Sequence, residues 1–81
     1  MNVVVKLFAA ARELAGQAEV TVEIAPGADV SELREALSAR LPKLAALASQ
    51  SLIAVNAEYA GDAMLVSEGD ELALIPPVSG G

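Results

Sequence analysis

The side chains that most often carry enzyme chemistry are missing from this sequence, which contains no cysteine and no histidine. Thiolate nucleophiles, disulfides, Cys-bound zinc and the usual general base are therefore excluded. The reactive group that is left is the α-carboxylate of Gly81, which is ionised at pH 7 because its reference pKa is about 3.3–3.7. A carboxylate is a poor acyl donor until it is activated. We therefore expect no catalytic side chain, no metal site and no bound cofactor, and we expect partners to supply the catalysis.

The six residues leading to this carboxylate have the composition of a thin extended tail: Pro76, Pro77, Val78, Ser79, Gly80 and Gly81. Proline lacks a backbone N–H and favours an extended path, and glycine has no side chain. Six extended residues span roughly 20 Å, which suits insertion into a narrow pocket of another protein. We predict a domain over residues 1–75 and an insertion tail over residues 76–81. The alternative is a frayed terminus, because chain ends are often loosely held.

Length and charge restrict the partners that this chain can have. Its 81 residues make one small domain with a formal net charge of −6. Nucleic acids and anionic membranes attract basic surfaces, so we expect neither as a partner. The acidic balance suits a basic surface on another protein, or serves solubility alone. We find no signal peptide or transmembrane pattern, and a domain without disulfides fits the reducing cytoplasm.

Apolar periodicity predicts the elements that position the tail. Alternation indicates strands over residues 2–8, 18–24, 52–56 and 71–75. Asp29 and Glu32 predict a capping box at the start of the main helix, whose apolar stripe is Val30, Leu33, Leu37 and Leu41. Shorter helical segments are expected at 9–15 and 43–49, whereas in 57–66 only a turn at Gly61-Asp62, before Met64-Leu65-Val66, is assigned. One helix can cover one face of one mixed sheet, so we predict an α+β, ubiquitin-like β-grasp fold.

In that fold the last strand lies parallel to the first, and the tail leaves the middle of the sheet. Phe8 and Ile75 would then face away from the main helix and form an apolar patch at the tail root, extended by Val4 and Ala73. An uncovered apolar patch on a small domain often marks a binding surface. The alternative is that residues 57–66 fold over the patch and make it part of the core.

Several segments of the sequence, taken in order, resemble the small subunit of molybdopterin synthase, a β-grasp sulfur carrier. They are Val5-Lys6-Leu7-Phe8-Ala9, Arg12-Glu13-Leu14-Ala15-Gly16, Val55-Asn56, Gly69-Asp70-Glu71-Leu72-Ala73 and the terminal Pro-Pro-Val-Ser-Gly-Gly. The resemblance implies that an adenylating enzyme of the ubiquitin-activating kind uses ATP to activate Gly81. It implies that the resulting thiocarboxylate enters the large subunit and gives its sulfur to a cyclic pyranopterin phosphate.

The same resemblance implies roles for individual residues. Gly81 carries the sulfur, Gly80 is its slender neighbour, and the segment from Pro76 to Ser79 inserts into the partner. Phe8 and Ile75 lie in the docking surface, and Arg12 makes a polar contact with a partner. Many relatives have an aromatic residue at the position of Ile75, so the apolar role is kept and a stacking contact is not expected.

Three alternatives stay open at this point. One is a sulfur carrier for thiamin synthesis or tRNA thiolation, and another is a ubiquitin-like protein modifier. The third is a β-grasp interaction module whose tail is incidental. Asp70 and Glu71 form a candidate acid–base pair. Neighbouring residues that enter a strand point to opposite faces, so we expect a solvated turn there.

Overall fold

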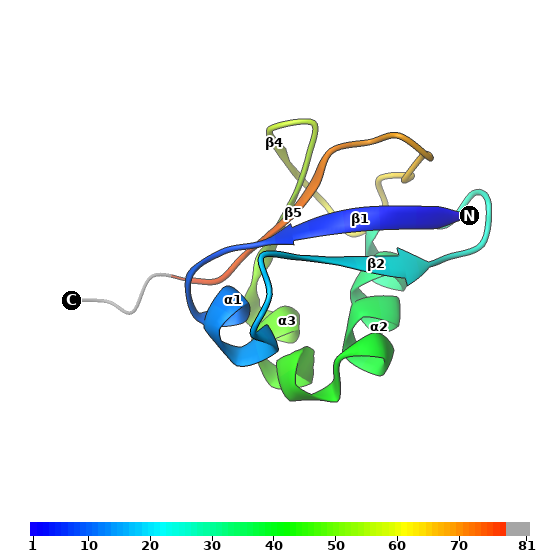
Figure 1. Cartoon of the computed structure of the whole chain (residues 1–81). Helices are drawn as coiled ribbons and strands as arrows, with labels where there is room; N and C mark the ends of the chain where they lie inside the picture. Colours follow the sequence, from blue (N-terminus) through cyan, green and yellow to red (C-terminus); the bar gives the residue numbers. More distant parts are fainter. Residues whose placement is uncertain (78–81) are drawn as a thin grey trace.

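The computed structural model describes residues 1–77, which form one mixed sheet with the helices beneath one of its faces (Figure 1). The strands are β1 (Asn2–Leu7), β2 (Glu19–Glu23), β3 (Leu52–Val55), β4 (Glu58–Ala60) and β5 (Leu72–Ile75). The helices are α1 (Ala9–Ala15), α2 (Val30–Arg40), the 3-10 helix η1 (Pro42–Leu44) and α3 (Ala45–Gln50). The strand order β2-β1-β5-β3-β4 puts the last strand of the chain in the centre.

The pairing of β5 fixes where the chain leaves the sheet. β1 is antiparallel to β2 and parallel to β5, as predicted. β5 is also antiparallel to β3, so both of its edges are paired along the ladder. A parallel pair requires a crossover, and here the crossover contains α2. The predicted α+β fold with a ubiquitin-like β-grasp arrangement is thereby confirmed.

The core lies between α2 and one face of the sheet. Burial alternates along β1, where Val3, Val5 and Leu7 are buried and the residues between them are exposed. Leu72 and Leu74 of β5 join them, as do three residues of the predicted helical stripe, Val30, Leu33 and Leu37. Leu41 is only partly buried but packs against the same core. Because strand side chains alternate, this packing leaves the even-numbered residues of β1 on the opposite, open face.

The predicted capping box begins α2. The backbone N–H of Glu32 donates to Oδ1 of Asp29 at 3.0 Å, and the backbone N–H of Asp29 donates to Oε1 of Glu32 at 3.3 Å. The Ser31 hydroxyl also donates to Asp29, and this bond, followed by that from Glu32, lowers the pKa of the Asp29 carboxyl. The helix ends at Arg40 with Leu41 as its C-cap, and Pro42 then begins η1 at a first-turn position.

The prediction of four strands was wrong, because β4 forms a hairpin with β3. Val55 pairs with Glu58, so the connecting loop consists of Asn56 and Ala57 alone. Both have positive φ, 52° and 69°, as a type I′ turn requires. Asn-Ala lacks the glycine that usually announces such a turn, and a strand of three residues is too short for a clear alternation. Sequence patterns therefore did not reveal the hairpin.

The segment after β4 lies along α2 and does not cross the open face. Arg34 of α2 donates to the carbonyl oxygens of Ala48 and Ser51, and its Nη2 lies 3.2 Å from Oδ1 of Asp62. The backbone N–H of Val30 donates to the Met64 carbonyl at 2.9 Å. The possibility that residues 57–66 cover the patch at the tail root is therefore wrong. Within residues 1–77, no helix has the length and apolar character needed to cross a membrane.

Candidate functional site: an apolar hollow at the tail root

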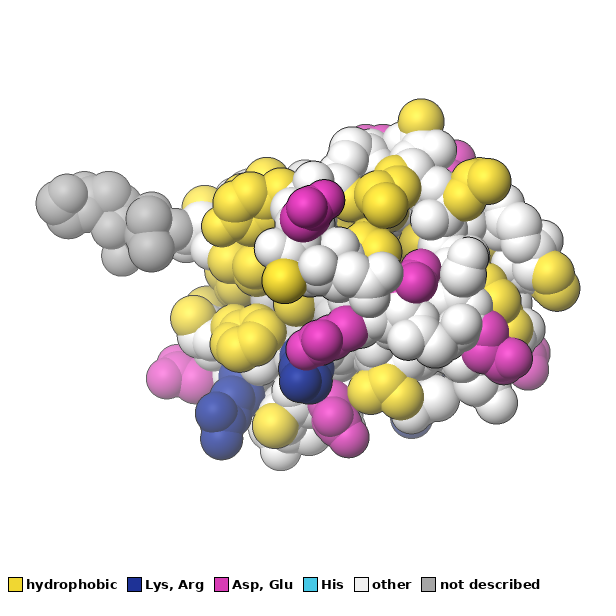
Figure 2. Space-filling view, turned by 90° about the horizontal axis from the view of Figure 1, so that it is seen from above, with side chains coloured by type: hydrophobic (Ala, Val, Ile, Leu, Met, Phe, Trp, Pro, Cys, Tyr) yellow, Lys and Arg dark blue, Asp and Glu magenta, His cyan; other side chains and the backbone are white. Residues whose placement is uncertain are grey.

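A hollow in the open face of the sheet lies beside the end of β5. Its lining comes from four strands and their connections: Lys6, Phe8, Ala54, Ala57, Tyr59, Glu71, Ala73 and Ile75. Figure 2 looks onto this face and shows hydrophobic side chains gathered near the end of the described chain, with charged side chains along one border. An apolar depression with few polar groups is the usual form of a recognition surface.

The register of the sheet explains why the surface is hollow here. One row of paired residues crosses four strands, from Lys6 to Ala73, from Ala73 to Ala54, and from Ala54 to Tyr59. Two alanines therefore form the floor, and longer side chains form the rim. Ala54 is only 6% exposed although it faces away from α2. The floor of the depression is therefore made of small apolar side chains.

The structure brings together the two apolar residues that were expected at the tail root. Phe8 and Ile75 both line the hollow, together with Ala73. Phe8 lies just beyond β1, in extended conformation, as the N-cap of α1, so the predicted strand 2–8 ends one residue earlier. Ala9 follows it with a φ of 49°, which turns the chain sharply away from the sheet. Val4 is exposed on the same face but is not part of the lining.

Tyr59 is the largest of the lining residues that sequence reasoning missed; the others are Lys6, Ala54, Ala57 and Glu71. Its side chain is 69% exposed at the rim, opposite Ala54 on the outermost strand. Large aromatic side chains are enriched at protein interfaces, where they bury much area at little cost in entropy. The signal that would have found Tyr59 is the Asn56-Ala57 turn. Once that hairpin is recognised, the pairing of Tyr59 with Ala54 follows.

The charged groups of the lining are Lys6 and Glu71, and they pair with each other. Nζ of Lys6 lies 3.2 Å from Oε1 of Glu71, and the two side chains are 51% and 64% exposed. An exposed pair of this kind contributes little to stability. Glu19 of β2 lies opposite Lys6 on its other side, so Lys6 sits between two carboxylate-bearing residues.

Asp70, the other member of the candidate acid–base pair, uses both of its carboxylate oxygens as hydrogen-bond acceptors within a turn. Its Oδ2 accepts from the backbone N–H of Ser67 at 2.8 Å, and its Oδ1 accepts from Nδ2 of Asn56 at 3.1 Å. These two bonds, in that order, lower the pKa of the Asp70 carboxyl. A carboxylate held ionised in this way is a poor proton donor. Among residues 1–77, no three acidic side chains gather so as to hold a metal ion.

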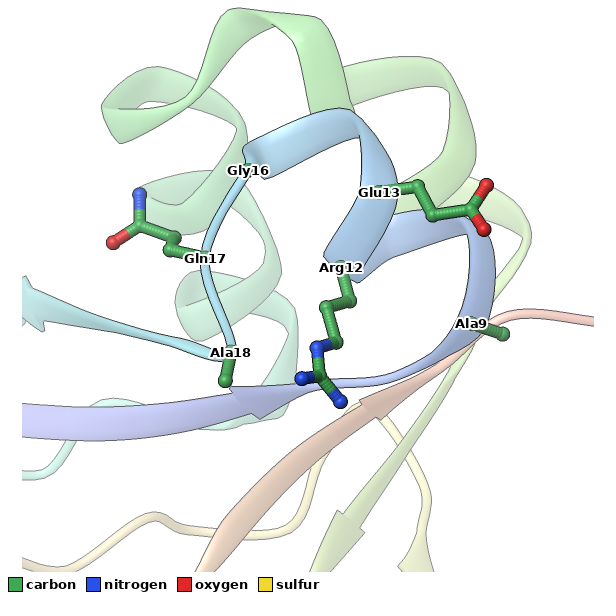
Figure 3. Close-up of a pocket in the computed structure, with 6 residues that line it drawn as sticks. All are labelled: Ala9, Arg12, Glu13, Gly16, Gln17 and Ala18. Atoms are coloured by element: carbon green, nitrogen blue, oxygen red, sulfur yellow. The ribbon is translucent and has the colours of Figure 1, made fainter.

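Arg12 lies in a separate hollow at the end of the sheet. The lining consists of Ala9, Arg12, Glu13, Gly16, Gln17 and Ala18. In Figure 3 the guanidinium of Arg12 points toward the end of β1 and Ala18, whereas Glu13 points away from it. The Arg12 side chain makes no ion pair or hydrogen bond within residues 1–77.

The root of the tail is part of the folded domain. Pro76 is buried and Pro77 is exposed. The predicted boundary after residue 75 stays a prediction, although the packing of Pro76 extends one residue beyond it. Val78, Ser79, Gly80 and Gly81 lie outside the described residues, so their assignment to the tail also stays a prediction.

Comparison with known proteins places the chain in a family. The ThiS family matches residues 5–81. The molybdopterin synthase sulfur carrier subunit of Arabidopsis thaliana is 38% identical over 81 residues, which cover all of this chain and 84% of the plant protein. The crystal structure of SAMP1 from Haloferax volcanii superposes with a TM-score of 0.88 at 34% identity and full coverage of both chains.

A third relative has a solved structure with a related description. It is a putative molybdopterin converting factor subunit 1 from Pyrococcus furiosus, with a TM-score of 0.82 and 33% identity, covering 95% of this chain and 98% of that one. The agreement extends through nearly the whole sequence and includes the tail. The chain therefore belongs to the ThiS family and is a homologue of the molybdopterin synthase sulfur carrier subunit.

Proposed function

We propose that this chain is the sulfur carrier of a molybdopterin synthase and that Gly81 bears the sulfur. The observation that carries the proposal is the apolar hollow at the root of the tail. It occurs in a chain that aligns over its full length with a sulfur carrier subunit of that enzyme. The large subunit of the synthase docks on the hollow, and the tail that starts beside it enters the active site of that subunit.

Activation of Gly81 needs a separate enzyme. An adenylating enzyme of the ubiquitin-activating kind binds ATP, and a carboxylate oxygen of Gly81 attacks the α-phosphorus with loss of pyrophosphate. A sulfur donor then attacks the acyl carbon, AMP leaves, and a thiocarboxylate results. The chain itself binds no cofactor in this scheme and contributes no catalytic side chain, which agrees with its lack of cysteine and histidine.

Transfer takes place inside the synthase. The thiocarboxylate sulfur attacks a carbon of a cyclic pyranopterin phosphate and displaces an oxygen substituent from it, which gives a thioester between Gly81 and the pterin. Water then attacks the acyl carbon and breaks its bond to sulfur, so that the sulfur stays on the pterin and Gly81 regains its carboxylate. Gly80 and Gly81 allow close approach because they carry no side chain. Catalytic side chains for this step belong to the large subunit. The dependence on ATP and the absence of cysteine agree with a cytoplasmic location.

Arg12 provides a second, polar contact beside the apolar one. Its guanidinium lies in its own hollow and bonds to no other group of residues 1–77, and a fork of donors suits a carboxylate on the partner. Phe8 connects the two sites, because it lines the apolar hollow and lies four residues before Arg12. A partner that covers the end of β1 reaches both.

Intact-mass spectrometry tests the proposal directly. The purified chain is incubated with its adenylating enzyme, ATP and a sulfur source, and we expect the mass change of one oxygen replaced by sulfur. A variant with one alanine added after Gly81 is the matched control and should stay unchanged. The sulfurated chain should then bind the synthase large subunit and support molybdopterin formation. A chain that never gains sulfur under these conditions would refute the proposal.

A protein modifier is the second candidate, and the likeness to SAMP1 of Haloferax volcanii favours it. Solved structures of this relative include one described as a small archaeal modifier protein. Both functions begin with the same activated Gly81 carboxylate. They differ in the acceptor, which is sulfur for a carrier and a lysine amine for a modifier. Covalent conjugates of the chain in cell extracts, without a thiocarboxylate, would favour the modifier.

A further inference from the structure

We infer that Lys6 and Glu71 act as one unit in the docking surface: a partner can cover this part of the surface when both charges are present as a pair, but not when one of them is left alone. The inference rests on the proposed docking at the hollow. The other lining residues are apolar: Phe8, Ala54, Ala57, Tyr59, Ala73 and Ile75. The pair therefore places two opposite charges inside the surface that an apolar partner must desolvate.

The geometry of the pair lowers the free-energy cost of burying its two charges. Lys6 lies on β1 and Glu71 directly precedes β5, the strand next to β1, so the sheet holds their backbones side by side. The 3.2 Å contact between Nζ and Oε1 already exists without a partner. The two charges thus enter the interface as one neutral, hydrogen-bonded unit. Burial of a matched pair is nearly balanced by its own attraction, whereas burial of one charge alone is costly.

The two charges are not equivalent. If Glu71 is removed, Lys6 still has Glu19 as its cross-strand neighbour on β2. If Lys6 is removed, Glu71 has no such replacement, because its neighbour on the β3 side is the uncharged Asn56, which exchanges backbone and side-chain hydrogen bonds with it. Loss of Lys6 should therefore harm docking more than loss of Glu71.

A double-mutant cycle tests the inference, with binding of the synthase large subunit followed by surface plasmon resonance. Lys6→Met should raise the dissociation rate about 10- to 100-fold, and Glu71→Met should raise it less. The double variant should bind within about threefold of the wild type, because no lone charge is buried. The association rate constant should change by less than about threefold in the two single variants and in the double variant.

The pair Arg34–Asp62 supplies the matched control. It has the same 3.2 Å separation but lies on the helix side of the sheet, away from the hollow. Asp62→Asn should therefore leave both rate constants unchanged. Circular dichroism and the midpoint of urea unfolding should show that the Met variants are folded, since exposed pairs contribute little to stability.

Two results would overturn the inference. If the losses of binding free energy in the two single variants add up in the double variant, Lys6 and Glu71 each contact an opposite charge on the partner. Changes confined to the association rate and its salt dependence would mean that the pair stays at a hydrated rim. Failure of the wild-type chain to bind the large subunit at all would instead count against the proposed function.

Discussion

Asn56 and Asp70 are joined by a hydrogen bond of 3.1 Å between Nδ2 and Oδ1, although 14 residues separate them in the chain. The other amide atom of Asn56, Oδ1, accepts from the backbone N–H of Glu71 at 2.9 Å. The backbone N–H of Asn56 in turn donates to the Glu71 carbonyl at 2.7 Å. One side chain therefore ties the β3–β4 hairpin to the start of β5. Two segments of the family resemblance, one containing Val55-Asn56 and the other Gly69-Asp70-Glu71, are therefore hydrogen-bonded to each other in the fold.

Replacement of Asp70 by alanine should lower the free energy of unfolding by about 1–2 kcal/mol, because the bonds from Ser67 and Asn56 are lost. The pKa of Asp70 is lowered from its ordinary value of 3.8, so this stabilisation is fully present above that pH. It disappears as the pH falls through the lowered pKa. Urea unfolding at pH 7 and below pH 3.8 should show that the difference in the free energy of unfolding between variant and wild type is smaller in acid. Glu68→Ala on the same turn is the control and should change stability little at either pH.

Replacement of Ala57 by glycine should stabilise the domain by about 0.5–1 kcal/mol. Ala57 has a φ of 69°, a left-handed conformation that costs a residue with a Cβ about 1–2 kcal/mol. Part of the gain is cancelled by the greater chain entropy of glycine in the unfolded state. Ala60→Gly in β4 is the control, because Ala60 has no positive φ and should lose about 0.5–1 kcal/mol. If urea titrations show the same change in the free energy of unfolding for both variants, the backbone at Ala57 is not strained.

Replacement of Ala73 by leucine should fill the hollow and weaken binding of the large subunit by at least about tenfold. Ala73 lies on the floor and points toward solvent, so the larger side chain has room without displacing the core. The thermal midpoint should therefore change by only a few degrees. Ala46→Leu on the exposed side of α3 makes the same chemical change away from the hollow. Isothermal titration calorimetry on both variants separates a filled site from a general effect of added apolar surface.

Replacement of Tyr59 by alanine should reduce affinity for the large subunit by about 1–2 kcal/mol, as truncation of an interface aromatic often does. It should leave the free energy of unfolding within about 0.5 kcal/mol of the wild type, because the side chain is 69% exposed. Leu65, at 63% exposure, lies outside the hollow and is the matched control. If Leu65→Ala weakens binding as much as Tyr59→Ala, the docking face is not the one described.

Much of the fold was predictable because its signals are local. The exchange of hydrogen bonds between Asp29 and Glu32 follows from two residue types at a spacing of three. The buried face of β1 follows from its alternation, and the parallel pairing of β1 with β5 follows from the crossover rules. These features depend on residues close together in the chain or on the order of the elements.

The site was predictable only in part, because it depends on register. Phe8 and Ile75 could be placed on one face from the alternation within the first and last strands together with the predicted parallel pairing of those strands. Tyr59, Lys6 and Glu71 join the same hollow through pairings across four strands, and no short segment of sequence specifies those. The hairpin that brings Tyr59 opposite Ala54 turns at Asn56-Ala57, whose second residue is a poor match for its own conformation. Sequence patterns are weakest where a strained residue takes the place that glycine usually fills.

The burial of Pro76 at the end of a strand paired on both edges has a mechanical consequence. A force that pulls on the tail would act along β5. The hydrogen bonds of β5 to β1 and to β3 would resist it together. In the proposed complex, the folded domain would therefore limit how far the tail can enter the partner. Each residue beyond Pro77 extends the thread by at most about 3.3–3.6 Å. If the tail enters a partner as proposed, the number of its residues therefore limits the distance that its last residue can reach from the domain.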